Sequence, residues 1–272
     1  MKLLVIDRDR ANCEQMEEYL KDSGIEASFE PIRAKAVDAF KAGGYDAIFI
    51  DPAPQGEVRP FVIGIRRSTA SFPPIIVMAH DMTREQVMAV GGNAHLAKPL
   101  DKGDFLTKAQ NAGRLSDVIR MMADDRADFP SKDGIIAKSA FNQLFITCLD
   151  RADRYGENSY LIFADVDNLD EIAAKDGAEA AATVADNLRR TISRTRRLSD
   201  IAGHIEQARF CLLLLRVAKE DEPFLAANRF AEALKENHDL ISTSATPAVL
   251  KVWLFGIPSG EIAVEHAVTG NN

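Results

Sequence analysis

Two residues three positions apart, Arg197 and Asp200, have the side chains needed to recognise the edge of a guanine base. An arginine fork can donate two hydrogen bonds to O6 and N7 of guanine, and an aspartate can accept from the N1 and N2 donors. Other arginines nearby would suit the phosphates of a dianionic dinucleotide: Arg189, Arg190, Arg194 and Arg196. The alternative is that residues 194–197 form the charged end of a helix, where the helix dipole favours cations.

A second group of charged residues lies in the N-terminal half, where Asp7, Asp51 and Lys98 each follow a short apolar segment. Short, bounded apolar segments of this kind are typical of strands buried on both faces. Because the carboxyl ends of parallel strands meet at one edge of a sheet, we expect the three side chains to lie together there.

The first hundred residues alternate short strands with amphipathic helices, which predicts an α/β domain with a doubly wound parallel sheet. The strands are expected at residues 3–6, 27–30, 47–50, 75–78 and 94–97, and the helices at residues 10–23, 34–42, 60–68 and 84–90.

Helical spacing continues from Asp101 to about Asp128, which we interpret as a last helix that runs on into a connector. The C-terminal half has fewer strands, and its central pair forms a hairpin, which is typical of an α+β domain. We therefore predict a first domain at residues 1–120, a helical connector at 121–132 and a second domain at 133–272. The later helices are expected at residues 138–154, 178–195 and 224–237, and the strands at 159–165, 200–205, 209–217 and 249–255.

With Asp7, Asp51 and the Lys98-Pro99 pair, the first domain resembles the receiver domains of two-component response regulators, which have a flavodoxin-like (βα)5 fold. The resemblance implies that Asp51 is the phosphoacceptor, that Asp7 helps to hold Mg²⁺, and that Lys98 contacts the phosphoryl group.

The receiver resemblance is incomplete at three positions. Arg8 stands where the family has a second acid, Ala79 where it has a hydroxyl residue, and His95 where it has an aromatic switch residue. A guanidinium offers no acceptor and adds a fixed positive charge, so Arg8 should weaken Mg²⁺ binding at this site. Two interpretations of Asp51 stay open: a phosphorylated switch, or a structural acid paired with Arg8 or Lys98.

The second domain resembles the GGDEF domain of diguanylate cyclases, which implies an α+β nucleotide-cyclase-like fold. Arg197 and Asp200 stand at the family's distance ahead of a hairpin that reads Glu-Gln-Ala-Arg-Phe at 206–210, where the family has Gly-Gly-Asp-Glu-Phe. In that family the Arg-x-x-Asp element is an inhibitory site for cyclic di-GMP. The resemblance also makes Asp165 the counterpart of a metal-binding aspartate in the reaction that joins two GTP molecules.

The catalytic parts of that family are missing from this sequence. Arg209 stands where a second metal carboxylate is needed, and Glu206 and Gln207 replace the glycines that let backbone approach the nucleotide. Asp165 is therefore interpreted as a vestigial metal residue that pairs locally with Arg209. We predict no catalytic residues and no enzyme activity. The positions that would contact guanine are alanines, Ala173 and Ala182.

Composition limits the partners. Lys+Arg 33 against Asp+Glu 41 gives a net charge of −8, which argues against nucleic-acid or anionic-membrane binding. No apolar run approaches the ~18 residues of a membrane span. The cysteines, Cys13, Cys148 and Cys211, are odd in number and far apart, which favours reduced thiols in the cytoplasm.

The two resemblances, with the residues that are missing from each, imply a non-catalytic signalling protein that acts as a cyclic di-GMP receptor through Arg197, Asp200 and Arg194. An unidentified protein partner is expected, and a homodimer is left open. Mg²⁺ at the receiver-like site is the one cofactor considered, and no other metal site is expected. Two alternatives remain: an active or conditional diguanylate cyclase response regulator, and a scaffold that works without nucleotide.

Overall fold

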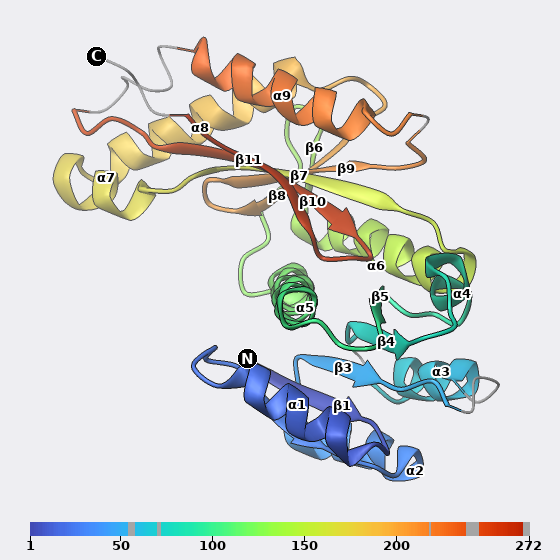
Figure 1. Cartoon of the computed structure of the whole chain (residues 1–272). Helices are drawn as coiled ribbons and strands as arrows, with labels where there is room; N and C mark the ends of the chain where they lie inside the picture. Colours follow the sequence, from blue (N-terminus) through green and yellow to red (C-terminus); the bar gives the residue numbers. More distant parts are fainter. Residues whose placement is uncertain (54–57, 70–71, 218, 238–244, 269–272) are drawn as a thin grey trace. The chain divides into compact units, whose positions relative to one another are not determined.

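The computed structural model describes residues 1–53, 58–69, 72–217, 219–237 and 245–268. The chain divides into two compact units (Figure 1). The first comprises Met1–Met121, Cys148–Glu157 and Ile257–Glu261. The second comprises Met122–Thr147, Asn158–Gly256 and Ile262–Asn272.

The first unit contains a wholly parallel sheet with the strand order β2-β1-β3-β4-β5. This is the flavodoxin-like order of a doubly wound fold, so the predicted fold class is confirmed. Its strands are β1 (Lys2–Ile6), β2 (Glu26–Phe29), β3 (Ala47–Ile50), β4 (Ile75–Ala79) and β5 (Ala94–Ala97). Its helices are α1 (Arg10–Leu20), α2 (Arg33–Gly43), α3 (Val58–Ser68), α4 (Arg84–Ala89) and α5 (Lys102–Ala123).

Burial on both faces explains why the central strands β1, β3 and β4 are almost entirely apolar. Successive side chains of a strand point to opposite faces. Leu3 and Val5 of β1 accordingly pack in a cluster with residues of α1 and α5, and Leu4 and Ile6 pack with residues of α2 and α3. The sequence has no polar face to place toward water here, because helices cover both faces.

The helix α5 ends at Ala123, so the expectation of a helical connector over residues 121–132 is wrong beyond that residue. The Asp124 carboxylate accepts a hydrogen bond from the backbone N–H of Arg126 at 3.1 Å and also binds its guanidinium. Such local side-chain bonds compete with the helical pattern. Pro130 then disfavours helical geometry at the residue before it.

The six-stranded sheet has the order β11-β10-β7-β9-β8-β6, with β9 antiparallel to both β7 and β8. This is the expected α+β arrangement. Its strands are β6 (Ile135–Ala137), β7 (Ser159–Val166), β8 (Ile201–Glu206), β9 (Arg209–Leu214), β10 (Leu250–Ile257) and β11 (Ile262–Val268). The helices of this part of the chain are α6 (Lys138–Tyr155), α7 (Leu169–Asp176), α8 (Ala178–Thr195) and α9 (Glu222–Lys235).

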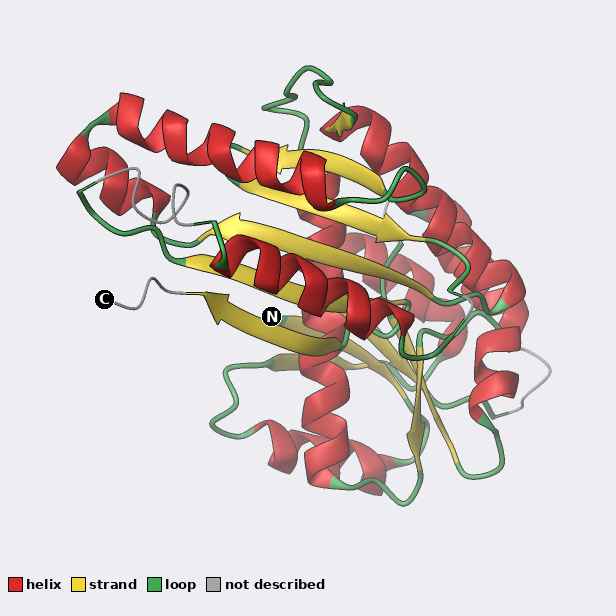
Figure 2. Ribbon diagram, turned by 90° about the horizontal axis from the view of Figure 1, so that it is seen from above, coloured by secondary structure: helices red, strands yellow, loops and turns green. Residues whose placement is uncertain are grey.

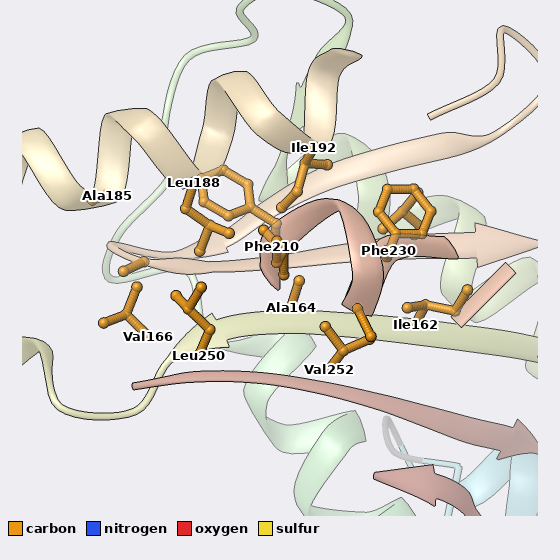
Figure 3. Packing of buried hydrophobic residues seen from close by; sticks show 14 of the residues in the cluster. Ile162, Ala164, Val166, Ala185, Leu188, Ile192, Phe210, Phe230, Leu250 and Val252 are labelled. Carbon is orange, nitrogen blue, oxygen red and sulfur yellow. The ribbon is translucent and has the colours of Figure 1, made fainter. Parts of the chain in front are cut away.

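The helices α8 and α9 lie across one face of this sheet (Figure 2). Leu188 and Ile192 of α8 and Phe230 of α9 pack over Phe210 and Leu250 of the strands (Figure 3). Phe163 of β7 lies outside this cluster and stacks on Trp253 of β10, with ring centroids 4.0 Å apart. Among the described helices, none has both the length and the apolar content that crossing a membrane requires.

Candidate functional site

The acidic edge of the first unit is built at the ends of β1, β3 and β5, as expected. Lys98 Nζ donates to Asp7 Oδ2 at 2.9 Å and also contacts Asp51 Oδ2. Burial alone would lower the pKa of Lys98, but the hydrogen bonds to Asp51 and Asp7 outweigh it and raise the pKa. The lysine is therefore a fixed cation between two carboxylates.

Backbone N–H groups also donate hydrogen bonds to these carboxylates. Asp51 Oδ1 accepts from the N–H of Ala53 at 2.7 Å, and Asp7 Oδ1 accepts from the N–H of Asp9 at 2.9 Å. Arg33, at the start of α2, donates to the carbonyl oxygens of Asp51 and Ala53 at 2.9 and 2.8 Å. The sequence did not point to Arg33, because it lies in the first turn of α2 and not directly after a strand.

A cavity of about 370 Å³ opens beside these residues, but its lining suits Mg²⁺ poorly. Arg8 lines it and is exposed, and Asp9 is committed as the N-cap of α1, accepting from the N–H of Ala11. The other two carboxylates, those of Asp7 and Asp51, are held by Lys98. Within the described ranges, no three His, Cys, Asp or Glu side chains gather closely enough to hold a metal ion.

Of the two pairings considered for Asp51, the structure has the one with Lys98. In the part of the chain that is described, Arg8 forms no ion pair. Ala79 ends β4 and is buried, and its carbonyl oxygen lies 3.1 Å from Nε2 of His95 on β5. Two of the three positions that depart from the receiver pattern, Ala79 and His95, thus contact each other.

Asp165 pairs with Arg209, as the sequence predicts. The two residues face each other across β7 and β9, where opposite charges attract. Arg209 Nε and Nη2 donate to Asp165 Oδ2 at 3.0 and 2.8 Å, and Nη1 donates to Glu206 at 2.7 Å. Burial raises the pKa of Asp165, although Arg209 acts in the opposite direction. A guanidinium therefore occupies the place beside Asp165 where a cation would bind.

The Arg197–Asp200 segment is a tight turn closed by Asp200. The N–H of Asp200 donates to the carbonyl of Arg197 at 3.0 Å, and Asp200 Oδ2 accepts from the N–H of Arg197 at 2.8 Å. This double closure explains the spacing of the pair, since an aspartate readily bonds backbone groups of its own turn. Leu198 and Ser199 form the exposed tip.

The turn borders a cavity of about 340 Å³ lined by Arg197, Asp200 and residues of the β9–α9 region. Arg229 of α9, which the sequence did not single out, donates to Asp200 Oδ2 at 3.2 Å. Arg197 stays 64% exposed, with Glu222 Oε1 at 4.0 Å from its Nη1. Arg194 is exposed in the last turn of α8 and does not line the cavity. The other lining residues are Leu214, Lys219, Asp221, Leu225 and Ala226.

No family model and no curated protein matches this chain. Among solved structures, it is similar to a two-component response regulator from Clostridium difficile, with 25% identity over 42% of this chain and 96% of that one, at a TM-score of 0.38. A response regulator receiver domain protein from Clostridium thermocellum has 20% identity over 43% and 97%, at 0.39. The GGDEF domain of YfiN (or TpbB) from Pseudomonas aeruginosa has 22% identity over 44% and 74%, at 0.38. The fold itself follows from the strand orders given above.

Proposed function

We propose that this chain is a signalling response regulator whose second unit binds cyclic di-GMP and does not synthesise it. The observation that carries the proposal is the Arg197–Asp200 turn, which presents a largely exposed guanidinium and a carboxylate at one cavity. Guanine has the complementary edge, with acceptors at O6 and N7 and donors at N1 and N2.

The carboxylate of Asp200 keeps capacity for a ligand. Among the described residues, only its Oδ2 accepts hydrogen bonds, from Arg197 and Arg229. Oδ1 can therefore accept from the guanine donors while Oδ2 keeps the turn closed. The cations Lys219 and Arg229 at the same cavity would attract the phosphates of the ligand.

The apolar side of the cavity suits the face of a base. Leu214, Leu225 and Ala226 contribute apolar side chains to its lining. A planar ring placed against them would lose water from its faces while its edge stays hydrogen-bonded.

Synthesis of cyclic di-GMP is disfavoured, because Asp165 already has a cation. A metal ion at Oδ2 of Asp165 would have to displace the two hydrogen bonds from Arg209, and Oδ1 is buried. Electrostatic repulsion by the guanidinium opposes that exchange. The hairpin also carries the side chains of Glu206 and Gln207 where close approach to a nucleotide needs glycine.

For the first unit we propose contacts with an unidentified protein partner, with weak phosphorylation of Asp51. A phosphoryl group on Oδ2 would have to displace Lys98, which also holds Asp7. Without a second acid beside Asp7, little Mg²⁺ would be available to assist.

The test is titration calorimetry of the full chain with cyclic di-GMP. Arg197→Ala should lose roughly 1.5–3 kcal/mol for each charged hydrogen bond. Arg197→Lys should recover little of that, since an ammonium cannot bridge O6 and N7. Arg190→Ala is the matched control: it removes the same charge from the same region, and Arg190 pairs with Asp186 outside the cavity.

Absence of binding at about 100 μM ligand, or unchanged binding by Arg197→Ala, would favour the nucleotide-independent scaffold instead. Incubation with GTP and Mg²⁺ or Mn²⁺ should give no cyclic di-GMP. A product that disappears in Asp165→Asn would favour the cyclase.

A further inference from the structure

Arg196 directly precedes the Arg197–Asp200 turn, and its side chain contacts the backbone of that turn. It caps the C-terminus of α8, where its own N–H donates to the carbonyl of Ile192. Its Nη1 lies 3.3 Å from the carbonyl oxygen of Arg197 and 3.2 Å from that of Asp200. One guanidinium nitrogen thus bridges the first and last residues of the turn.

The guanidinium of Arg196 also packs against Gly134. A Cβ added to Gly134 would overlap Nη2 of Arg196 and lie 2.9 Å from its Cζ. Gly134 has a φ of +77°, which a residue with a side chain rarely adopts. Both constraints favour glycine, so this contact depends on the absence of a side chain.

The Nε of Arg196 is buried and has no hydrogen-bond partner among the described residues. A buried donor without a partner costs free energy, so the side chain is held in place by its other contacts. Those contacts are the turn on one side and Gly134 on the other.

The Asp133–Gly134 segment is itself fastened to α8. Ser193 Oγ donates to the carbonyl oxygen of Asp133 at 2.7 Å. Nη1 of Arg189, whose side chain is buried, forms an ion pair with Asp133 Oδ2. Residues 133–134, the end of α8 and the binding turn are therefore joined by contiguous contacts.

We infer that Arg196 is a positioning residue for the Arg197–Asp200 turn and that it couples the turn to the segment at residues 133–134. The inference rests on the proposed binding of cyclic di-GMP at this turn. Because coupling between two sites is reciprocal, ligand binding at the turn also stabilises the 133–134 segment. That segment lies within the second unit and directly precedes β6, so occupancy of the cavity would also be detected at the start of this strand.

The first readout is the affinity for cyclic di-GMP, measured by calorimetry with the full chain. Arg196→Gln and Gly134→Ala should each weaken binding about tenfold, through loss of the bridging hydrogen bonds. Gly177→Ala is the matched control for Gly134→Ala, because Gly177 has a φ of +96° and a Cβ there would meet nothing within 4 Å. Gly177→Ala should introduce similar backbone strain but leave the affinity for cyclic di-GMP unchanged.

The second readout is amide hydrogen exchange of ligand-free protein, which does not depend on nucleotide binding. Arg196→Gln should speed exchange at the N–H of Arg197 and Asp200, while Arg190→Ala should leave it unchanged. If the wild-type chain binds no cyclic di-GMP but this exchange effect is present, the proposed function fails and the positioning role stands. Unchanged exchange in both Arg196→Gln and Gly134→Ala would overturn the positioning role, whatever the wild-type affinity.

Discussion

The two charged clusters of this chain use similar residues in opposite ways. Around Lys98, whose side chain is 8% exposed, one ammonium joins Asp7 and Asp51, and the charges are satisfied internally. Around Arg197, the guanidinium is largely exposed, and the carboxylate of Glu222 lies 4.0 Å away, at the upper distance limit for an ion pair. Paired charges at a buried sheet edge stabilise the fold, whereas a loosely paired arginine at a cavity leaves its donors accessible.

The difference arises from the position of each cluster in the fold. The carboxyl ends of parallel strands converge, so charges placed there meet and neutralise one another. A turn between α8 and β8 instead projects its tip to solvent, as the exposure of Leu198 and Ser199 shows. Variants in each cluster test this contrast between a closed and an open cluster.

The largest effect is expected from Lys98→Ala, which leaves two carboxylates together without their cation. Breaking a buried ion pair costs about 3–5 kcal/mol of unfolding free energy. Because the pKa of Lys98 is raised, its stabilising contribution is complete below the ordinary lysine pKa and disappears only as the pH rises through the folded value. Urea unfolding at pH 7 measures the loss.

Lys108→Ala is the control for Lys98→Ala, because Lys108 forms an ion pair with Asp104 on the surface of α5. It should cost less than about 1 kcal/mol. Adding Asp51→Asn to Lys98→Ala should recover part of the stability. A Lys98→Ala variant as stable as the control would mean that the acidic edge is not a closed cluster.

Arg209→Ala should cost about 2 kcal/mol, because Asp165 loses the charged hydrogen bonds that accompany its burial. Its pKa, already raised by burial, should then rise further. A group with a raised folded pKa favours folding below its unfolded pKa, and that advantage is lost as the pH rises through the folded value. The deficit of Arg209→Ala, measured by urea unfolding, should therefore be smaller at pH 4 than at pH 7.

Lys251→Ala is the control for Arg209→Ala, because it removes a cation from the neighbouring ion pair of the same sheet. Lys251 lies 2.9 Å from the Oδ1 atom of Asp167, an aspartate that is half exposed. Lys251→Ala should cost less than Arg209→Ala and should show no comparable change between pH 4 and pH 7. An equal pH dependence in both variants would remove the special role given to the Asp165–Arg209 pair.

Arg8→Asp tests whether the closed cluster can be opened to a metal ion. Replacing a positive by a negative charge beside Asp7 should raise the affinity for Mg²⁺ by about 1 kcal/mol, or roughly fivefold. Calorimetric titration with MgCl₂ measures it, and Arg10→Asp is the control, since Arg10 lies outside the cavity. Stoichiometric, Mg²⁺-dependent phosphorylation of the wild-type chain by acetyl phosphate would contradict the closed-cluster account.

The smallest effect is expected from Glu222→Gln, which removes the acid nearest to Arg197. An exposed ion pair is worth about 0.2–1 kcal/mol, so the affinity for cyclic di-GMP should rise about twofold in calorimetry. Glu220→Gln is the control, because it removes the same charge from a neighbouring residue that does not line the cavity. Weaker binding by Glu222→Gln would show that Glu222 contacts the ligand instead of competing with it.

Much of the fold could be predicted from the sequence, because its apolar segments are short and well bounded. The convergence of Asp7, Asp51 and Lys98 follows from the strand ends alone. Arg33 and Arg229 could not be found in this way, since each lies on a helix and reaches its site only through tertiary packing.

Three elements of the second half were not predicted: β6, α7 and β11. The strand β6 has only three residues and is defined by its parallel pairing with β8. The helix α7 is short, and Asn168 at its N-cap makes no side-chain capping bond. Local patterns are weak in such elements, and long-range pairing decides them.

The stacking of Trp253 on Phe163 also gives the second unit its own optical signal. The chain has a single tryptophan, so fluorescence excited at the long-wavelength edge of the indole absorption band comes only from Trp253 of β10. Loss of the ring stack should change the emission when the six-stranded sheet unfolds. Emission therefore follows the stability of the unit that contains the proposed ligand cavity, while circular dichroism follows the helices and strands of the whole chain.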